Sequence, residues 1–198
     1  LVKRVLAGED VGYDLVEIET QVTAVRHLED GRVAVLLRET PFYAESGGQV
    51  SDLGEIVGTG WRVDVTDVRK FEGRTAAIGK LTGTLQFGTC VARVPTDERR
   101  DTERNHTAPH LLHAALRNHL GTHVQQRGSL VAPDRLRFDF AHVAKVSPAE
   151  MRTIQDEVND IILHNYPVRN EEKALAQARE EGAMALFGEK YGERVRTV

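Results

Sequence analysis

The chain has 198 residues, enough to bury the core of one large domain or two small ones. Its 40% hydrophobic and 28% charged residues are typical of a globular protein. No apolar run approaches the ~20 residues of a membrane helix, and the first residues lack the apolar core of a signal peptide. The net charge of −4 argues against a dedicated nucleic-acid binder, so any RNA contact must come from local patches. The single cysteine, Cys90, excludes an internal disulfide framework and predicts a cytoplasmic protein.

The first half of the chain has the alternation of β-strands. Two apolar runs, residues 22–25 and 33–37, flank Asp30-Gly31, a pair that predicts a hairpin with a type I′ turn. The alternation continues at a second set of apolar positions: Val63, Val65, Val68, Leu85, Phe87, Val91 and Val94. Short strands punctuated by glycines at intervals of about 8–12 residues predict a small barrel.

The character of the sequence changes at Pro95. A highly charged stretch with helical propensity follows, so we place a boundary near residue 96 and expect two domains, residues 1–95 and 96–198. Residues 105–120 are expected to form an amphipathic helix, and the alternating residues 136–140 a half-buried strand.

The remaining helices are predicted from caps and periodicity. Ser147-Pro148-Ala149-Glu150 is a capping box with proline at the first helical position. The helix that it begins carries one apolar stripe and stops by Pro167; the stripe comprises Met151, Ile154, Val158, Ile161 and Ile162. A shorter helix is expected around residues 172–181, ending at Gly182.

Three histidines of the helix at residues 105–120 have the spacing of one face. His106, His110 and His113 stand at i, i+4 and i+7, on a face shared with Arg117 and apart from the apolar side of the helix. Two histidines at i and i+4 can hold one zinc ion. The alternative is that they are solvated or capping histidines near a helix start, and the spacing alone leaves both open.

Four long segments resemble the editing domains of alanyl-tRNA synthetases. They are residues 40–52 (TPFYAESGGQVSD), residues 105–117 (NHTAPHLLHAALR), residues 120–131 with the strand 136–140, and residues 182–196 (GAMALFGEKYGERVR). They occur in the order of that family, and the resemblance spans roughly residues 12–198.

The resemblance implies an α+β fold with two parts. A small, translation-factor-like β barrel with a glycine-rich loop would be followed by an α+β editing core, whose helices pack on an antiparallel sheet. The implied activity is an aminoacyl-tRNA hydrolase, which removes serine or glycine from wrongly charged tRNA(Ala). The implied partners are the acceptor end of tRNA(Ala) and the rest of a synthetase chain, with no membrane. Ligation and ATP binding would belong to another part of that chain.

The resemblance also implies a zinc site of which this sequence holds half. The family's two histidine ligands fall on His106 and His110, and its Cys and His ligands lie beyond Val198. Cys90 is not that cysteine, and His113 is one turn too far along to replace a ligand. We therefore expect the 198-residue piece to be metal-free or to hold a weak ion. Pro109 departs from the family, and we expect it to be tolerated because it lies in the first turn of the helix.

Further site residues are carried over from the matching motifs. Gln126 falls on the glutamine of the editing pocket, and its amide could read a small polar side chain or orient water; a surface glutamine is the alternative. Thr107, Gly128 and Ser129 fall in the substrate-binding segments, although Gly128-Ser129 could be a simple turn.

The motif Gly47-Gly48-Gln49 is given a place near the acceptor end, or the role of a tight turn. A GGQ loop also serves peptide release factors, but three residues are weak evidence. Arg137 and Asp139 are expected to form an ordinary cross-strand pair.

Three other readings remain open. One is a free-standing trans-editing protein of the same superfamily, the AlaX type. Another is a non-catalytic tRNA-binding module, and the third is a metal-dependent hydrolase of small molecules. The missing initial Met and the abrupt end favour a fragment of a longer protein over the first of these.

Overall fold

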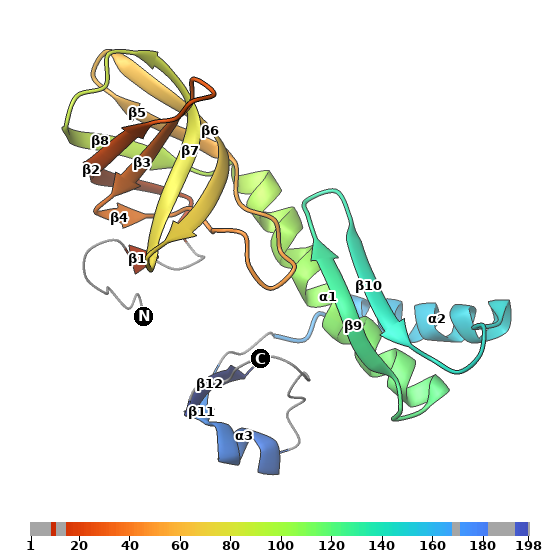
Figure 1. Cartoon of the computed structure of the whole chain (residues 1–198). Helices are drawn as coiled ribbons and strands as arrows, with labels where there is room; N and C mark the ends of the chain where they lie inside the picture. The colour runs from red at the N-terminus through yellow and green to blue at the C-terminus, as the bar shows by residue number, and fades with distance from the viewer. Residues whose placement is uncertain (1–8, 11–14, 168–170, 182–192, 198) are drawn as a thin grey trace. The chain divides into compact units, whose positions relative to one another are not determined.

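The computed structural model describes residues 9–10, 15–167, 171–181 and 193–197. The chain divides into two compact units, Leu1–Pro109 with Gly128–Asp139 and His110–Arg127 with Phe140–Val198. The fold is mixed α+β, with a six-stranded antiparallel barrel and helices, as predicted (Figure 1). The expected helix end at Gly182 and most of the resembling segment 182–196 lie outside the described residues.

The barrel closes in the strand order β2-β3-β7-β6-β5-β8. Its strands are β2 (Glu17–His27), β3 (Val33–Leu37), β5 (Gly54–Gly58), β6 (Trp61–Phe71), β7 (Arg74–Gly83) and β8 (Gly88–Arg93). Every neighbouring pair is antiparallel. Two short strands, β1 (Glu9–Asp10) and β4 (Glu39–Thr40), form a separate parallel pair.

The barrel core is filled by the inward side chains of alternating residues. On β6 the inward positions shift phase, because a register irregularity between Val65 and Asp67 inserts one extra residue. Val63, Val65 and Val68 are therefore all buried, although their spacing is not a strict period of two. On β8 the buried residues are Cys90 and Ala92.

Two details predicted for the barrel are wrong. Asp30-Gly31 does join β2 to β3, but only Gly31 has a positive φ, of 81°, whereas a type I′ turn needs two such residues. Leu28 closes a three-residue loop instead, with its amide bonded to the Arg32 carbonyl. Phe87 is exposed outside the strands and Val91 points outward, because Cys90 and Ala92 occupy the inward phase of β8.

Helix α1 runs over Thr96–Leu120, so it begins nine residues before the expected start. Pro109 consequently lies inside the helix and not in its first turn, which corrects the prediction. A proline there has no N–H to donate to the carbonyl of Asn105, four residues earlier. Pro109 is itself buried.

Strands β9 (Gln125–Val131) and β10 (Leu136–Ala141) form a two-stranded sheet after α1, which confirms the strand expected at residues 136–140. Arg137 and Asp139 do form an ion pair, at 3.1 Å. However, the two residues lie two apart on the same strand, so the pair runs along β10 and is not cross-strand.

Helix α2 (Pro148–His164) begins with the predicted capping box at Ser147 and ends at Asn165 in the left-handed conformation. Its apolar stripe is only partly buried: Ile154 is covered, whereas Met151 and Ile162 are about half exposed. The helix expected at residues 172–181 is in fact strand β11 (Glu171–Ala174) followed by helix α3 (Leu175–Glu180). Strand β11 pairs antiparallel with β12 (Arg194–Thr197).

One buried ion pair joins the start of α1 to the loop that precedes β5. Arg99 donates through Nη2 and Nε to the two carboxylate oxygens of Asp52, at 2.5 and 3.3 Å. Their side chains are only 2% and 6% exposed. Arg99 also donates to the carbonyl of Pro41 at 2.8 Å, and Asp52 accepts from the amide of Tyr43 at 2.6 Å. The pair therefore holds both ends of the loop of residues 41–52 against α1.

We expect Asp52→Ala to lower the free energy of unfolding by about 3–5 kcal/mol, because it leaves the Arg99 guanidinium buried without its counter-charge. Denaturant unfolding followed by circular dichroism measures this. The matched control is Asp101→Ala, which removes the carboxylate of an exposed α1 ion pair with Arg104 and should cost less than about 1 kcal/mol. Equal effects of the two substitutions would contradict the structural weight given to the buried pair.

Candidate functional site

The glycine-rich motif forms a tight turn. Ser46 and Gln49 exchange two backbone hydrogen bonds of 3.2 and 3.0 Å, which leaves Gly47 and Gly48 as the two central residues. Both glycines have positive φ, 59° and 83°. This is the arrangement of a type I′ turn, which side chains other than glycine, asparagine and aspartate rarely adopt. The turn type expected at Asp30-Gly31 is thus found here.

The turn is attached to strand β9. The amide of Val131 donates to the carbonyl of Gly48 at 2.8 Å, and the amide of Val50 donates to the carbonyl of Val131 at 3.0 Å. A Cβ atom on Gly48 would lie 2.5 Å from Ser129 Oγ and 2.7 Å from the Ser129 carbonyl oxygen. Glycine is therefore required at residue 48 both for its backbone conformation and for this close approach.

Gln49 turns inward from the turn and meets helix α1. It is 5% exposed, and its Oε1 lies within hydrogen-bond distance of Nδ1 of His106, at 2.6 Å. His106 is otherwise an exposed residue of α1. The structure thus brings together predicted residues of three motifs, with Gly48 and Gln49 from the turn, Ser129 from β9 and His106 from α1.

Neighbouring residues of the first unit support this cluster. Asn105 donates from its side-chain amide to the carbonyls of Ala132 and Pro133, at 2.8 and 3.0 Å. Thr107 donates its hydroxyl to the carbonyl of Glu103 at 3.1 Å, one turn back on α1. Its oxygen can still accept a hydrogen bond. A Cβ on Gly128 would lie 2.8 Å from Asp139 Oδ2, so Gly128 also packs closely against a neighbouring side chain.

His110 and Gln126 belong to the second unit. His110 is exposed on α1, four residues after His106, and Gln126 is half-buried on β9. His113 is 6% exposed, which corrects its assignment to an outer face with the other two histidines. Burial lowers the pKa of His113, and the charge of Arg117 lowers it further. Arg117 donates to the carbonyl of Val124, and His113 Nε2 lies 3.4 Å from the same oxygen.

The donor set bears on whether a metal could bind. Within the described residues, no group of three or more His, Cys, Asp or Glu side chains is placed to hold an ion. Cys90 is buried in the barrel, and burial raises the pKa of its thiol to about 11, which disfavours the thiolate. His123 and His142 stack on each other, with Nε2 and Nδ1 2.9 Å apart. The imidazoles of His106 and His110 are donors of a kind that suits zinc.

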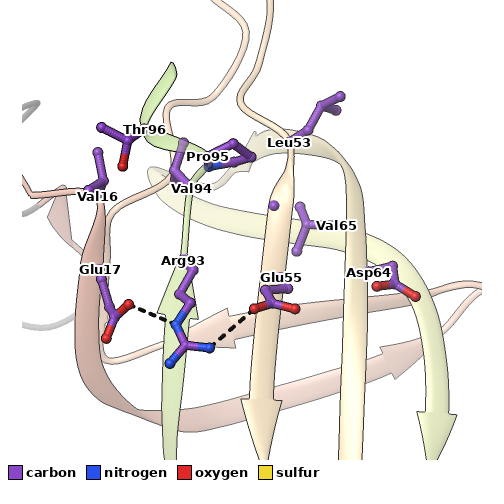
Figure 2. A pocket seen from close by; sticks show the side chains of 11 residues that line it. Val16, Glu17, Leu53, Glu55, Asp64, Val65, Arg93, Val94, Pro95 and Thr96 are labelled. Atoms are coloured by element: carbon purple, nitrogen blue, oxygen red, sulfur yellow. Dashed lines mark hydrogen bonds and ion pairs between the residues drawn. The ribbon is translucent and has the colours of Figure 1, made fainter. Parts of the chain in front are cut away.

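A cavity of about 530 Å³ lies elsewhere, at the side of the barrel. Figure 2 shows Arg93 between Glu17 and Glu55, with hydrogen bonds to both carboxylates. Leu53 and Val65 also line the cavity. None of the predicted site residues lines it. The cavity therefore gives no support to the site expected from the sequence.

Sequence reasoning missed the contacts that assemble the cluster. Gln49 is 57 residues from His106, and Asp52 is 47 residues from Arg99. Periodicity and spacing report only on residues that share one helix or strand, so neither pair left a signal of that kind. The positions themselves lay within the resembling segments, which was the available hint for Gln49 and Asp52.

Comparison with known proteins finds one family over the first half and one kind of enzyme over nearly all of the chain. Residues 4–100 match the family described as tRNA synthetases class II (A). Alanine–tRNA ligases from two strains of Thermus thermophilus are 50% identical over 203 residues, covering 97% of this chain. The ligase of Halorhodospira halophila is 50% identical over 193 residues. The chain spans 23% and 22% of the length of these relatives, so the similarity covers a limited region of alanine–tRNA ligases.

Within the described residues, no helix combines the length and the apolar character needed to span a bilayer.

The turn offers a paired stability test in two adjacent glycines. We expect Gly47→Ala to cost about 1–2 kcal/mol, the strain of a left-handed residue, because nothing lies within 4 Å of the added methyl group. Gly48→Ala carries the same strain and also collides with Ser129, so it should cost about 1–3 kcal/mol more. Thermal and denaturant unfolding of both variants give the difference. Equal losses would show that Gly48 does not lie against Ser129.

Proposed function

We propose that this chain is part of an alanine–tRNA ligase and forms its editing region, which hydrolyses tRNA(Ala) wrongly charged with serine or glycine. The observation that carries the proposal is the meeting of Gly48, Gln49, His106 and Ser129 in one cluster. These residues come from separate segments that resemble the family's editing motifs. The identity of 50% over 97% of the chain supports the ligase assignment.

A ligase for alanine needs such an activity on physical grounds. A pocket shaped for alanine cannot exclude glycine, which is smaller. It also rejects serine weakly, because an apolar pocket discriminates against one added hydroxyl by only ~10². Hydrolysis of the wrong ester at a second site restores the accuracy that binding alone does not provide.

The proposed reaction is attack of water on the ester that joins the amino acid to the terminal ribose. The ester bond breaks, the amino acid leaves as a carboxylic acid and the ribose regains its hydroxyl. The amide of Gln126 would bond the serine hydroxyl or orient the attacking water, because it can both donate and accept. Thr107 would offer its hydroxyl oxygen as an acceptor to the substrate.

His106 and His110 would hold zinc through their imidazole nitrogens. The bound ion would supply Lewis-acid chemistry, by polarising the ester carbonyl or activating water. The hydrogen bond from His106 Nδ1 to Gln49 suits this role, since it leaves the lone pair of the neutral ring on Nε2. Complete zinc sites use three or four protein ligands, so further ligands would have to join these two.

Two ligands alone should bind zinc poorly, because each missing ligand removes favourable binding and protons compete for histidines near pH ~6.5. We expect the 198-residue chain to contain well below one zinc ion per molecule after dialysis. Elemental analysis of the dialysed protein measures the content. Tight stoichiometric zinc would show that ligands had been missed, with His113 and His142 the first to replace.

The activity can be tested in a chimera, in which this chain replaces the matching region of the Thermus thermophilus ligase. We expect the chimera to deacylate Ser-tRNA(Ala) and to spare Ala-tRNA(Ala). Gln126→Ala should slow serine release by about 10-fold or more, the loss of one hydrogen bond of ~1.4 kcal/mol. Gln86→Ala, at an exposed loop position, is the control and should leave the rate unchanged.

Two results would count against this assignment. Equal hydrolysis of the serine and alanine esters by the unmutated chimera would refute editing. Unchanged serine release in Gln126→Ala would remove Gln126 from the mechanism, whatever the rate of the parent chimera.

A further inference from the structure

We infer that Gln49 is a positioning residue for His106: its amide oxygen selects the tautomer with the proton on Nδ1 and fixes the ring, so that Nε2 is the atom presented for function. The role given to Nε2 rests on the proposed function. The positioning itself concerns only the contact between Gln49 and His106, and it can be measured without tRNA or metal.

The chemistry of the contact determines which nitrogen of His106 carries the proton. Gln49 Oε1 is an amide carbonyl oxygen, which accepts hydrogen bonds and donates none. It lies 2.6 Å from His106 Nδ1, and a hydrogen bond between these two atoms requires the ring proton on that nitrogen. A neutral imidazole has one N–H and one lone pair, and the lone pair is therefore on Nε2.

Gln49 is held in place by backbone hydrogen bonds. Its amide and carbonyl are both bonded to Ser46 across the type I′ turn. The peptide groups on either side are bonded to Val131, through the Gly48 carbonyl and the Val50 amide. Four backbone hydrogen bonds thus fix a side chain that is 5% exposed, so little rotamer freedom remains to be lost in holding His106.

The part of helix α1 that carries His106 is held in place by the bonds of neighbouring residues. Asn105, the preceding residue, donates two hydrogen bonds to carbonyls at residues 132 and 133, just beyond β9. Nearer the start of α1, Arg99 is bonded to Asp52, three residues after Gln49. Both partners of the Gln49–His106 contact are therefore held by separate bonds, and the hydrogen bond between them adds a constraint on the ring torsion and the tautomer.

The two ring nitrogens of His106 therefore have different roles. A histidine that binds a metal or a reacting group through one nitrogen usually donates its other N–H to an oxygen, which fixes tautomer and orientation. Gln49 supplies that oxygen from a loop far away in sequence. A glutamine after the two glycines thus has a chemical purpose beyond the turn, whose backbone conformation requires glycine only at residues 47 and 48.

The test is the tautomer of His106 in the metal-free 198-residue chain. Long-range ¹H–¹⁵N spectra at about pH 8, well above the ordinary histidine pKa of ~6.5, distinguish the two neutral forms. The His106 signals are assigned by their loss in His106→Gln. We expect Nδ1–H in the native chain, a shift to Nε2–H or a mixture in Gln49→Met, and retention of Nδ1–H in Gln49→Glu, which keeps the acceptor oxygen.

The matched control is Gln86→Met, the same change at an exposed loop position, which should leave the His106 signals unmoved. An Nε2–H form in the native chain, or an unchanged tautomer in folded Gln49→Met, would overturn the inference. If Gln49→Met does not fold, Gln49→Glu decides, since loss of Nδ1–H there would also overturn it.

A zinc titration of the native, Gln49→Met and Gln49→Glu chains separates this inference from the proposed function. Where zinc binds, we expect Gln49→Met to weaken its apparent affinity by about 10–100-fold and Gln49→Glu to restore it. Equal affinities in all three chains would overturn the inference as it concerns zinc. A native chain with the Nδ1–H tautomer but no zinc affinity would support positioning, whereas a chimera with the Thermus thermophilus ligase that also holds no zinc would count against the zinc part of the proposed function.

Discussion

The buried pair of Arg99 and Asp52 is the constraint on which the arrangement of the first unit depends. A carboxylate and a guanidinium that are almost completely covered must remain together, because separating them would leave a charge in an apolar setting. Asp52 also exchanges backbone and side-chain hydrogen bonds with Tyr43, which closes the loop of residues 41–52 on itself. The loop that carries the glycine-rich turn is therefore fixed on helix α1.

The sequence predicts the barrel well because its signals are local. Alternation identified β6, and Asp30-Gly31 identified the β2–β3 hairpin, although not its turn type. The phase shift on β6 could not be foreseen, because a bulge depends on how the partner strand pairs. The capping box of α2 was correct since all of its atoms lie within four residues.

The histidine helix shows where periodicity stops being informative. Spacing placed His106, His110 and His113 on one face, but burial separates them: the first two are exposed and the third is covered. A helical wheel predicts a single buried face only when the helix packs on one side. Helix α1 instead buries residues as different as Arg99, His113 and Leu116. The resemblance carried over the two exposed histidines, His106 and His110, and not the buried His113.

The Gly-Gly turn also explains why a three-letter motif can recur without shared chemistry. Two consecutive residues with positive φ restrict the choice of amino acid almost to glycine, whatever the loop is used for. Any chain that reverses direction so tightly and then presents a long amide side chain will have the same sequence, Gly-Gly-Gln. The likeness to the GGQ loop of release factors is therefore explained by the backbone conformation of the turn. Common ancestry or a common reaction has to be argued from the residues that the glutamine contacts.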